Sequence, residues 1–167
     1  MNAIVSTSQS AEEYLELGLR DQWHPVLASW EVAANPVGIT RLGENIVVWR
    51  DAEGQVHALE DRCPHRGARL SLGWNLGDRV ACWYHGVEVR ADGVVADVPA
   101  VHECPMTGTK CLKNYPVIEQ HGAIFIWFGI DANEQPAPLE FPEQLASEEW
   151  SAFLCQADWK VNHQYAI

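Results

Sequence analysis

The sequence lacks any apolar run long enough to cross a membrane, and it is poor in positive charge. No stretch approaches the ~18 consecutive apolar residues that a spanning helix needs. The 11 lysines and arginines are outnumbered by 23 aspartates and glutamates, so the net charge at pH 7 is −12. A protein of this charge is repelled by nucleic-acid phosphates and by anionic lipid headgroups. We therefore expect no nucleic acid and no membrane among its partners.

A secretory signal is also missing, and cysteine is scarce. The first ten residues are polar, without the basic start and apolar core of a signal peptide, which predicts a cytoplasmic location. Five cysteines, an odd number at irregular spacing, are a poor disulfide framework, and the cytoplasm keeps thiols reduced. We therefore expect metal binding by some of them, and no disulfides. The five are Cys63, Cys82, Cys104, Cys111 and Cys155.

Long helical periodicity is absent from most of the chain. Short runs rich in β-branched and aromatic residues instead lie between glycine, asparagine and aspartate breaks. This spacing predicts an all-β fold, a sandwich or barrel of antiparallel sheets, over about residues 23–130. The predicted strands are 45–49, 56–60, 79–83, 87–90, 113–118 and 123–128.

Capping, proline and strand signals divide the chain into four parts. Ser10 and Glu13 form a capping-box pattern that predicts a short N-terminal helix. Three of the nine prolines lie in residues 131–142, which favours a linker there. A strand is predicted over 153–159 and a helix from Val161, and because the chain ends inside that helix we expect a truncated copy of a longer protein. The expected parts are an N-terminal helical segment (1–22), the β domain (23–130), a linker (131–150) and the start of a second, α+β domain (151–167).

Two short motifs carry the chemistry. Cys63-Pro64-His65 is followed, after sixteen residues, by Cys82-Trp83-Tyr84-His85. Two cysteines and two histidines can hold zinc or a [2Fe–2S] cluster. Structural zinc usually takes a pair of cysteines followed by a pair of histidines, whereas each half here holds one of each. Mixed pairs on two loops match a Rieske cluster, in which two histidines bind one iron and two cysteines the other.

The residues around these motifs resemble a known family. Arg62-Cys-Pro-His-Arg-Gly-Ala-Arg-Leu-Ser-Leu-Gly73 and Cys82-Trp-Tyr-His-Gly86 resemble the N-terminal Rieske domain of aromatic-ring-hydroxylating oxygenases, in the large (α) terminal subunit. The resemblance covers roughly residues 20–167 and is greatest to the phthalate- and carbazole-dioxygenase type. Further matches are Trp23-His-Pro-Val26, Leu42-Gly-Glu-Asn-Ile46, Tyr115-Pro-Val-Ile-Glu119 and Gly122-Ala-Ile-Phe-Ile-Trp127. Val87 departs from the pattern, because many members carry tryptophan there.

The resemblance implies an enzyme, the terminal component of an oxygenase that hydroxylates an aromatic substrate with O₂. It implies a [2Fe–2S] cluster on Cys63, His65, Cys82 and His85. A mononuclear non-haem Fe(II) is implied in a catalytic domain beyond this sequence, so no catalytic residue is expected here. The implied partners are a ferredoxin or reductase as electron donor and further copies of the chain in a homotrimer, with or without a β subunit.

Two other classes of Rieske protein are possible alternatives. Respiratory Rieske proteins carry an extra cysteine in each cluster loop, and this sequence has Ala68 and Tyr84 at those places, which excludes that class. A stand-alone Rieske ferredoxin has the same ligand pattern and remains the alternative, as an electron carrier. Such ferredoxins are shorter and lack both the segment Trp23-His-Pro-Val26 and the segment Trp159-Lys160, which favours the oxygenase.

Positive charge is concentrated beside the motifs. Residues 62–90 hold five arginines and two acidic residues, a net +3, whereas the rest of the chain carries −15. Complementary charge speeds the encounter of electron-transfer partners. We therefore predict that an acidic electron donor docks over Arg66, Arg69 and Arg79. The competing interpretation is that these arginines bond internally and face no partner.

Overall fold

The computed structural model describes residues 18–101, 103–130, 135–147, 149–151 and 159–161, together with residues 153, 155 and 157. Almost all regular structure in these ranges is strand, which confirms the predicted all-β class. The strands are β1 (Trp23–Ala28), β2 (Val37–Arg41), β3 (Glu44–Arg50), β4 (Val56–Glu60), β5 (Trp74–Asn75), β6 (Arg79–Ala81), β7 (Glu88–Arg90), β8 (Val95–Asp97), β9 (Asn114–Tyr115), β10 (Val117–Gln120) and β11 (Ala123–Trp127). Short helices are η1 (Ser29–Glu31), η2 (Leu70–Leu72) and α2 (Glu143–Ala146).

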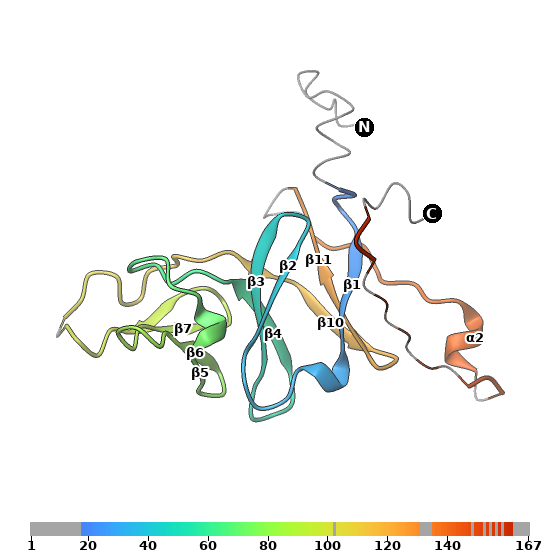
Figure 1. The fold of residues 1–167 in the computed structure, drawn as a ribbon, viewed down its shortest axis with the longest axis horizontal. Coiled ribbons are helices and arrows are strands. Elements are labelled where there is room, and N and C mark those ends of the chain that lie inside the picture. The colour runs from blue at the N-terminus through green and yellow to red at the C-terminus, as the bar shows by residue number, and fades with distance from the viewer. Residues whose placement is uncertain are drawn as a thin grey trace, which may run out of the picture.

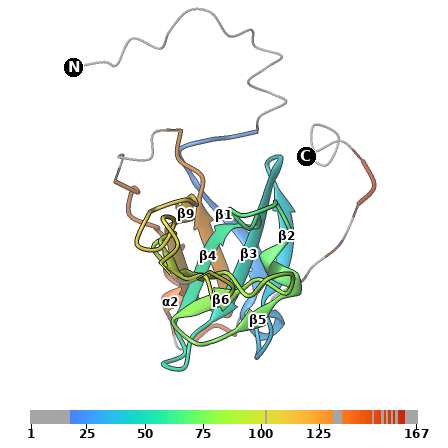
Figure 2. The same ribbon diagram turned by 90° about the vertical axis from the view of Figure 1, so that its left-hand side faces the viewer.

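The strands form three antiparallel sheets, ordered β1-β11-β10, β2-β3-β4-β9 and β5-β6-β7-β8. Figure 1 shows the three sheets following one another along the long axis, with β2, β3 and β4 in the middle. Figure 2 looks onto the end of the molecule that carries β5 and β6. The β2-β3-β4-β9 sheet therefore separates two hydrophobic cores.

Strand β3 supplies side chains to both cores. Ile46, Val47, Val48 and Trp49 are all completely buried. Successive side chains of a strand point to opposite faces, so Ile46 and Val48 enter the core shared with β1 and β11, whereas Val47 and Trp49 enter the core beneath β6, β7 and β8. A run of consecutive apolar residues, in place of strict alternation, is what burial on both faces requires.

The predicted strand over residues 113–118 is wrong as one element. Pro116 divides it, because proline has no N–H for a sheet ladder. Tyr115 of β9 pairs with Ala58 of β4, whereas Val117 of β10 pairs with Ile126 of β11. The chain thus crosses here from the middle sheet to the β1-β11-β10 sheet.

Four strands were not predicted, namely β1, β2, β5 and β8. Strand β1 lies at a sheet edge and contains Pro25, next to a register shift between Pro25 and Leu27. Proline is tolerated at such edges, although it lowers the strand signal of a sequence. Strands β5 and β8 have two and three residues, too few for a recognisable alternation.

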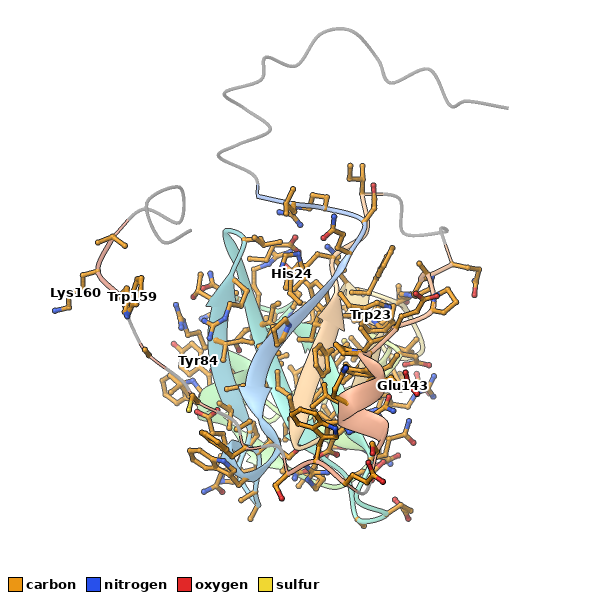
Figure 3. The ribbon with its side chains drawn as sticks, turned by 90° about the vertical axis from the view of Figure 1, so that its right-hand side faces the viewer. Trp23, His24, Tyr84, Glu143, Trp159 and Lys160 are labelled. Atoms are coloured by element: carbon orange, nitrogen blue, oxygen red, sulfur yellow. The ribbon has the colours of Figure 1, made fainter. Side chains whose placement is uncertain are left out.

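Part of the predicted linker lies against the β1-β11-β10 sheet. Phe141 contacts Phe125 of β11 and His121, with ring centroids 5.5 and 4.6 Å apart. The indole N–H of Trp23 donates to the carbonyl of Ala137 at 2.7 Å. Figure 3 shows Trp23 on the side of the sheet where α2 and its Glu143 lie. Residues 135–141 therefore cover one face of β1 and β11.

Several expectations about the ends of the chain are not tested by the structure. The predicted N-terminal helix and nearly all of the helix predicted from Val161 fall outside the described residues. Of the strand predicted over 153–159, the described residues 153, 155, 157 and 159 are not in a strand. The three boundaries between the four expected parts stay predictions. Within the part of the chain that the structure describes, no helix is long and apolar enough to span a membrane.

Candidate metal centre

The two predicted ligand motifs form two loops with the same backbone hydrogen bonds. In the first loop, residues 63–68, the N–H of Cys63 donates to the carbonyl of Ala68 at 2.7 Å. In the second loop, residues 82–87, the N–H of Cys82 donates to the carbonyl of Val87 at 2.8 Å. Each loop therefore closes from its cysteine to the residue five positions later, although the histidine is placed differently in the two motifs.

A glycine four residues after each cysteine completes the turn. The N–H groups of Gly67 and Gly86 donate to the carbonyls of Cys63 and Cys82, both at 2.9 Å. The φ angles of the two glycines are +71° and +73°, in the left-handed region that side chains rarely adopt. Both glycines flank the ligand motifs in the sequence, and their equivalent positions, four residues after each cysteine, are the signal that the two loops share one geometry.

The two loops place sulfur and nitrogen donors in different surroundings. Cys63 and Cys82 are 2% and 1% exposed and belong to the core beneath β6, β7 and β8. His65 is exposed and His85 is half-buried, and their ring centroids are 4.8 Å apart. The thiols are thus enclosed by apolar side chains, and the imidazoles lie together at the surface.

This donor set suits two metal ions, each bound by two of the four side chains. Among the described residues, no group of three or more cysteine, histidine or acidic side chains surrounds a single point. A tetrahedral zinc site requires four donors around one ion. A [2Fe–2S] cluster requires only a pair of protein donors at each iron, since sulfide supplies the others. The pairing of thiol with thiol and imidazole with imidazole therefore fits the cluster.

The protonation of the thiols depends on this burial. Burial raises the pKa of the Cys63 thiol, and the neighbouring Cys82 thiol raises it further, whereas backbone N–H groups of His65 and Arg66 act in the opposite direction. Two thiolates side by side in an apolar site need a cation to balance them. Metal binding must therefore displace protons from the thiols, as it does in other thiolate sites.

Gly73 brings the segment after the first loop against the strand before the second loop. A Cβ at Gly73 would lie 1.9 Å from the carbonyl oxygen of Ala81. Trp74 of β5 pairs with the same Ala81 of β6, immediately before Cys82. The close backbone contact between residues 73 and 81 therefore helps to hold the two ligand loops side by side.

Two aromatic side chains lie beside the imidazoles. The ring of Tyr84 packs on His85 with centroids 3.9 Å apart, and Trp83 stacks on Tyr84 at 5.5 Å. Trp83 and Tyr84 are 47% and 49% exposed. The position of Tyr84 in the second motif does not reveal this contact, because nothing in its spacing shows that its ring covers the neighbouring imidazole.

The arginines near the loops are partly neutralised by carboxylates. Three of the five arginines in residues 62–90 make ion pairs, namely Arg62 with Glu60, Arg79 with Asp78 and Glu88, and Arg90 with Asp92. Arg66 and Arg69 are exposed, and within the described residues the one side-chain hydrogen bond of Arg69 is a 3.4 Å contact to the side-chain oxygen of Asn45. The structure therefore favours an internal role for Arg79 and leaves Arg66 and Arg69 directed to solvent.

A cavity of about 510 Å³ lies beside the first loop and is lined by charges of both signs, from Glu44, Glu60, Arg62, Arg69 and Lys113 among others. The Glu44 carboxylate accepts hydrogen bonds from Lys113 at 2.7 Å and from the Tyr115 hydroxyl at 2.5 Å, and it pairs with Arg20. Burial alone would raise the pKa of Glu44, but these three donors together lower it. The cavity wall is therefore an internally compensated polar network.

Comparison with known proteins supports a Rieske assignment. Residues 22–116 match the family model described as the Rieske [2Fe–2S] domain. The oxygenase subunit of vanillate O-demethylase from a Pseudomonas species is 36% identical over 132 residues, which cover 79% of this chain and 36% of that protein. The terminal oxygenase component of carbazole 1,9a-dioxygenase from Metapseudomonas resinovorans is 32% identical over 154 residues, which cover 87% of this chain and 40% of that protein.

Solved structures agree with the sequence relatives. The oxygenase–ferredoxin complex of carbazole 1,9a-dioxygenase matches 74% of this chain and 32% of the compared chain, with a TM-score of 0.66 and 37% identity. Dicamba monooxygenase matches 77% of this chain and 38% of its own, with a TM-score of 0.68 and 29% identity. This chain thus spans 36% and 40% of the lengths of the two curated relatives. It belongs to the Rieske [2Fe–2S] domain family, and its predicted resemblance to Rieske oxygenase subunits is confirmed.

Proposed function

We propose that this chain is the electron-accepting part of a ring-hydroxylating oxygenase. In this proposal Cys63 and Cys82 bind one iron of a [2Fe–2S] cluster, and His65 and His85 bind the other. The observation that carries it is the pair of matching loops, which enclose two thiols in a core while two imidazoles lie 4.8 Å apart at the surface. Mixed ligation of this kind is the defining feature of Rieske centres.

The protein side of the electron path follows from the same geometry. When bound, the cluster stores one electron at a potential that imidazole ligation raises above that of an all-cysteine cluster. Residues around Cys63 and Cys82 exclude water from the sulfur side. His65 and His85 lead to the surface, and a metal-bound imidazole keeps its second ring nitrogen for a hydrogen bond. Electrons therefore enter and leave through the imidazole side.

The complete enzyme is proposed from the relatives. Both curated relatives described above are oxygenase components, and the match to the carbazole enzyme covers 87% of this chain, more than the residues 22–116 of the Rieske model. This extent supports an oxygenase over a stand-alone Rieske ferredoxin. In the whole protein, electrons would pass to a mononuclear non-haem Fe(II), held by two histidines and a carboxylate in a further domain, for hydroxylation of an aromatic substrate with O₂. A cytoplasmic homotrimer, with or without a β subunit, is part of this proposal.

The electron donor is proposed to be an acidic ferredoxin or ferredoxin-like reductase domain. One matched structure is a complex of the carbazole oxygenase with its ferredoxin, which supports this class of partner. Arg66 and Arg69 extend from the first ligand loop into solvent, and Trp83 and Tyr84 offer apolar surface beside the imidazoles. Arg79, also predicted to contact the donor, contributes less charge because it pairs with Asp78 and Glu88.

Metal and sulfide analysis tests the proposed function directly. The purified chain should contain two iron atoms and two acid-labile sulfides, with the visible absorption of an iron–sulfur protein. Cys63→Ser and His85→Ala should each lose this absorption, because one iron would lose a ligand. Cys104→Ser is the matched control and should keep it, since Cys104 is a half-buried free thiol that is not one of the four proposed ligands. One zinc and no sulfide would refute the proposal.

A further inference from the structure

Asp61 is a buried carboxylate that the proposed ligand set does not use. It is 3% exposed, and it is the one charged side chain that is buried among the described residues. It lies two residues before Cys63. Its two oxygens accept hydrogen bonds from a single residue, Ser71, whose backbone N–H lies 2.8 Å from Oδ1 and whose hydroxyl lies 2.6 Å from Oδ2.

These two hydrogen bonds close the base of the first ligand loop. Asp61 and Ser71 stand at either end of residues 62–70, the segment that carries Cys63 and His65. The backbone N–H of Asp61 also donates to the carbonyl of Asn45 in β3 at 2.9 Å. The contact between Asp61 and Ser71, called here the clasp, therefore joins both ends of the loop to the middle sheet.

Strand β2 encloses the clasp. A Cβ at Gly38 would lie 2.5 Å from the Ser71 hydroxyl oxygen and 3.3 Å from Oδ2 of Asp61. Only a residue without a side chain leaves space for the clasp at this position of β2. Asp61 is only 3% exposed, and this low solvent access strengthens the electrostatic effect of the carboxylate on nearby groups.

The charge of Asp61 is not balanced by a cation. None of the ion pairs in the described ranges involves Asp61. Two residues of chain span at most about 7 Å, so the carboxylate lies near the Cys63 end of the ligand set. Reduction adds one negative charge to a cluster. A buried negative charge at short range opposes that addition and lowers the reduction potential.

We propose that Asp61 is a positioning residue for the cluster: with Ser71 it holds the first ligand loop closed, and its buried charge lowers the reduction potential of the bound cluster. This inference rests on the proposed function. For two charges about 10 Å apart at an effective dielectric constant of about 20, Coulomb's law gives roughly a tenfold change in the equilibrium constant for reduction. Tenfold corresponds to about 59 mV for one electron.

Redox titration of the cluster-loaded chain tests the charge. Asp61→Asn keeps the side-chain shape and an oxygen for the Ser71 N–H but removes the charge, so its potential should be more positive by about the shift given above. Asp97→Asn is the matched control, because Asp97 is an exposed carboxylate at the end of β8, where solvent screens its charge, and its potential should equal that of the wild type. If Asp61→Asn had the wild-type reduction potential, the proposal that the charge of Asp61 lowers this potential would be overturned.

Cluster release tests the clasp independently of the charge. Ser71→Ala keeps the carboxylate but removes the 2.6 Å hydrogen bond, so iron should leave to a chelator several-fold faster, without the positive shift of Asp61→Asn. Ser151→Ala, at an exposed serine outside residues 22–116, should release iron at the wild-type rate. If Ser71→Ala released iron at the wild-type rate, the proposal that the clasp holds the ligand loop closed would be overturned. Absence of any iron–sulfur cluster from the wild-type chain would instead refute the proposed function.

Discussion

At the scale of single residues, Glu44 is expected to make stability depend on pH. Its pKa is lowered from 4.5 by hydrogen bonds from Lys113, Tyr115 and Arg20, against the opposing effect of burial. A carboxyl group with a lowered pKa stabilises the fold fully above its ordinary value, and the contribution is lost as the pH falls through the lowered value. The free energy of unfolding of Glu44→Gln at pH 7 should therefore be roughly 1–3 kcal/mol lower than that of the wild type.

Denaturant unfolding at a series of pH values measures this difference. The gap between wild type and Glu44→Gln should be largest at neutral pH. It should narrow as the pH falls below about 4.5, because the carboxyl binds a proton in the unfolded chain before it does so in the folded one. Glu53→Gln, at an exposed glutamate in the β3–β4 turn, should show no gap at any pH. A gap for Glu44→Gln that stays constant down to acid pH would mean that the charge of Glu44 does not stabilise the fold.

The residues that bind and the residues that support them differ in how well a sequence reveals them. Cys63, His65, Cys82 and His85 could be selected because thiol and imidazole are chemically distinct and stand at a recognisable spacing. Asp61 and Ser71 could not, because their contact depends on where η2 lies relative to β4. A hydrogen bond between residues ten positions apart leaves no pattern in a single sequence.

At the scale of elements, Gly73 is expected to control how η2 and β5 pack against β6. Its φ of −95° suits any residue, so the position excludes side chains by space alone. The group in the way is the backbone carbonyl of Ala81, which cannot rotate aside as a side chain would. Gly73→Ala should lower the free energy of unfolding by at least about 1–3 kcal/mol, the usual cost of overpacking, and should reduce cluster content.

Thermal unfolding of two glycine variants separates crowding from backbone strain. Gly54 has a φ of +87°, but no atom lies within 4 Å of the place that a Cβ would occupy, so Gly54→Ala reports strain alone. Its melting temperature should decrease less than that of Gly73→Ala, and its iron content should equal that of the wild type. Equal losses in the two variants would show that the contact with Ala81 is unimportant.

The elements that were predicted correctly share one physical property. Strands β3, β4 and β11 are apolar runs that lie inside sheets, so burial and strand propensity act together in their sequences. Among the elements that were missed or merged, β1 contains a proline, and β9 and β10 lie on either side of one. At these places the fold depends on sheet edges and on a crossing between sheets, which local sequence does not specify.

At the scale of the whole molecule, the two cores are expected to respond differently to loss of iron. Cys63 and Cys82 belong to the core with Trp49, whereas the core around Ile124 holds none of the four ligands. Because metal binding contributes folding energy to the site that it occupies, removal of iron should loosen the first of these cores. The core shared by β1, β3 and β11 should retain its packing.

Hydrogen exchange of the iron-loaded and iron-free chain measures this response. Amide protection should fall by several-fold or more in residues 62–98 after iron removal, and it should change little in β1 and β11. Uniform loss of protection across both cores would show that the molecule unfolds as one unit. Unchanged protection in residues 62–98 would show that the ligand loops are rigid without metal.

The whole-molecule charge distribution gives the last prediction, on electron delivery. The chain carries −12, yet Arg66 and Arg69 extend from the first ligand loop without a carboxylate partner among the described residues. Exposed charges of this kind accelerate the approach of an acidic donor, and their effect fades as the Debye length falls from about 10 Å at 0.1 M salt to about 3 Å at 1 M. Stopped-flow reduction by a donor ferredoxin should therefore slow steeply with ionic strength.

In Arg66→Glu and Arg69→Glu, the cluster should be reduced roughly tenfold more slowly at low salt and at almost the wild-type rate at 1 M, with cluster content unchanged. Lys160→Glu makes the same charge change at an exposed site outside residues 22–116 and should have little effect. Because Arg79 already pairs with Asp78 and Glu88, Arg79→Glu should instead destabilise the β6–β7 pairing. A rate independent of salt would assign Arg66 and Arg69 to contacts within the protein.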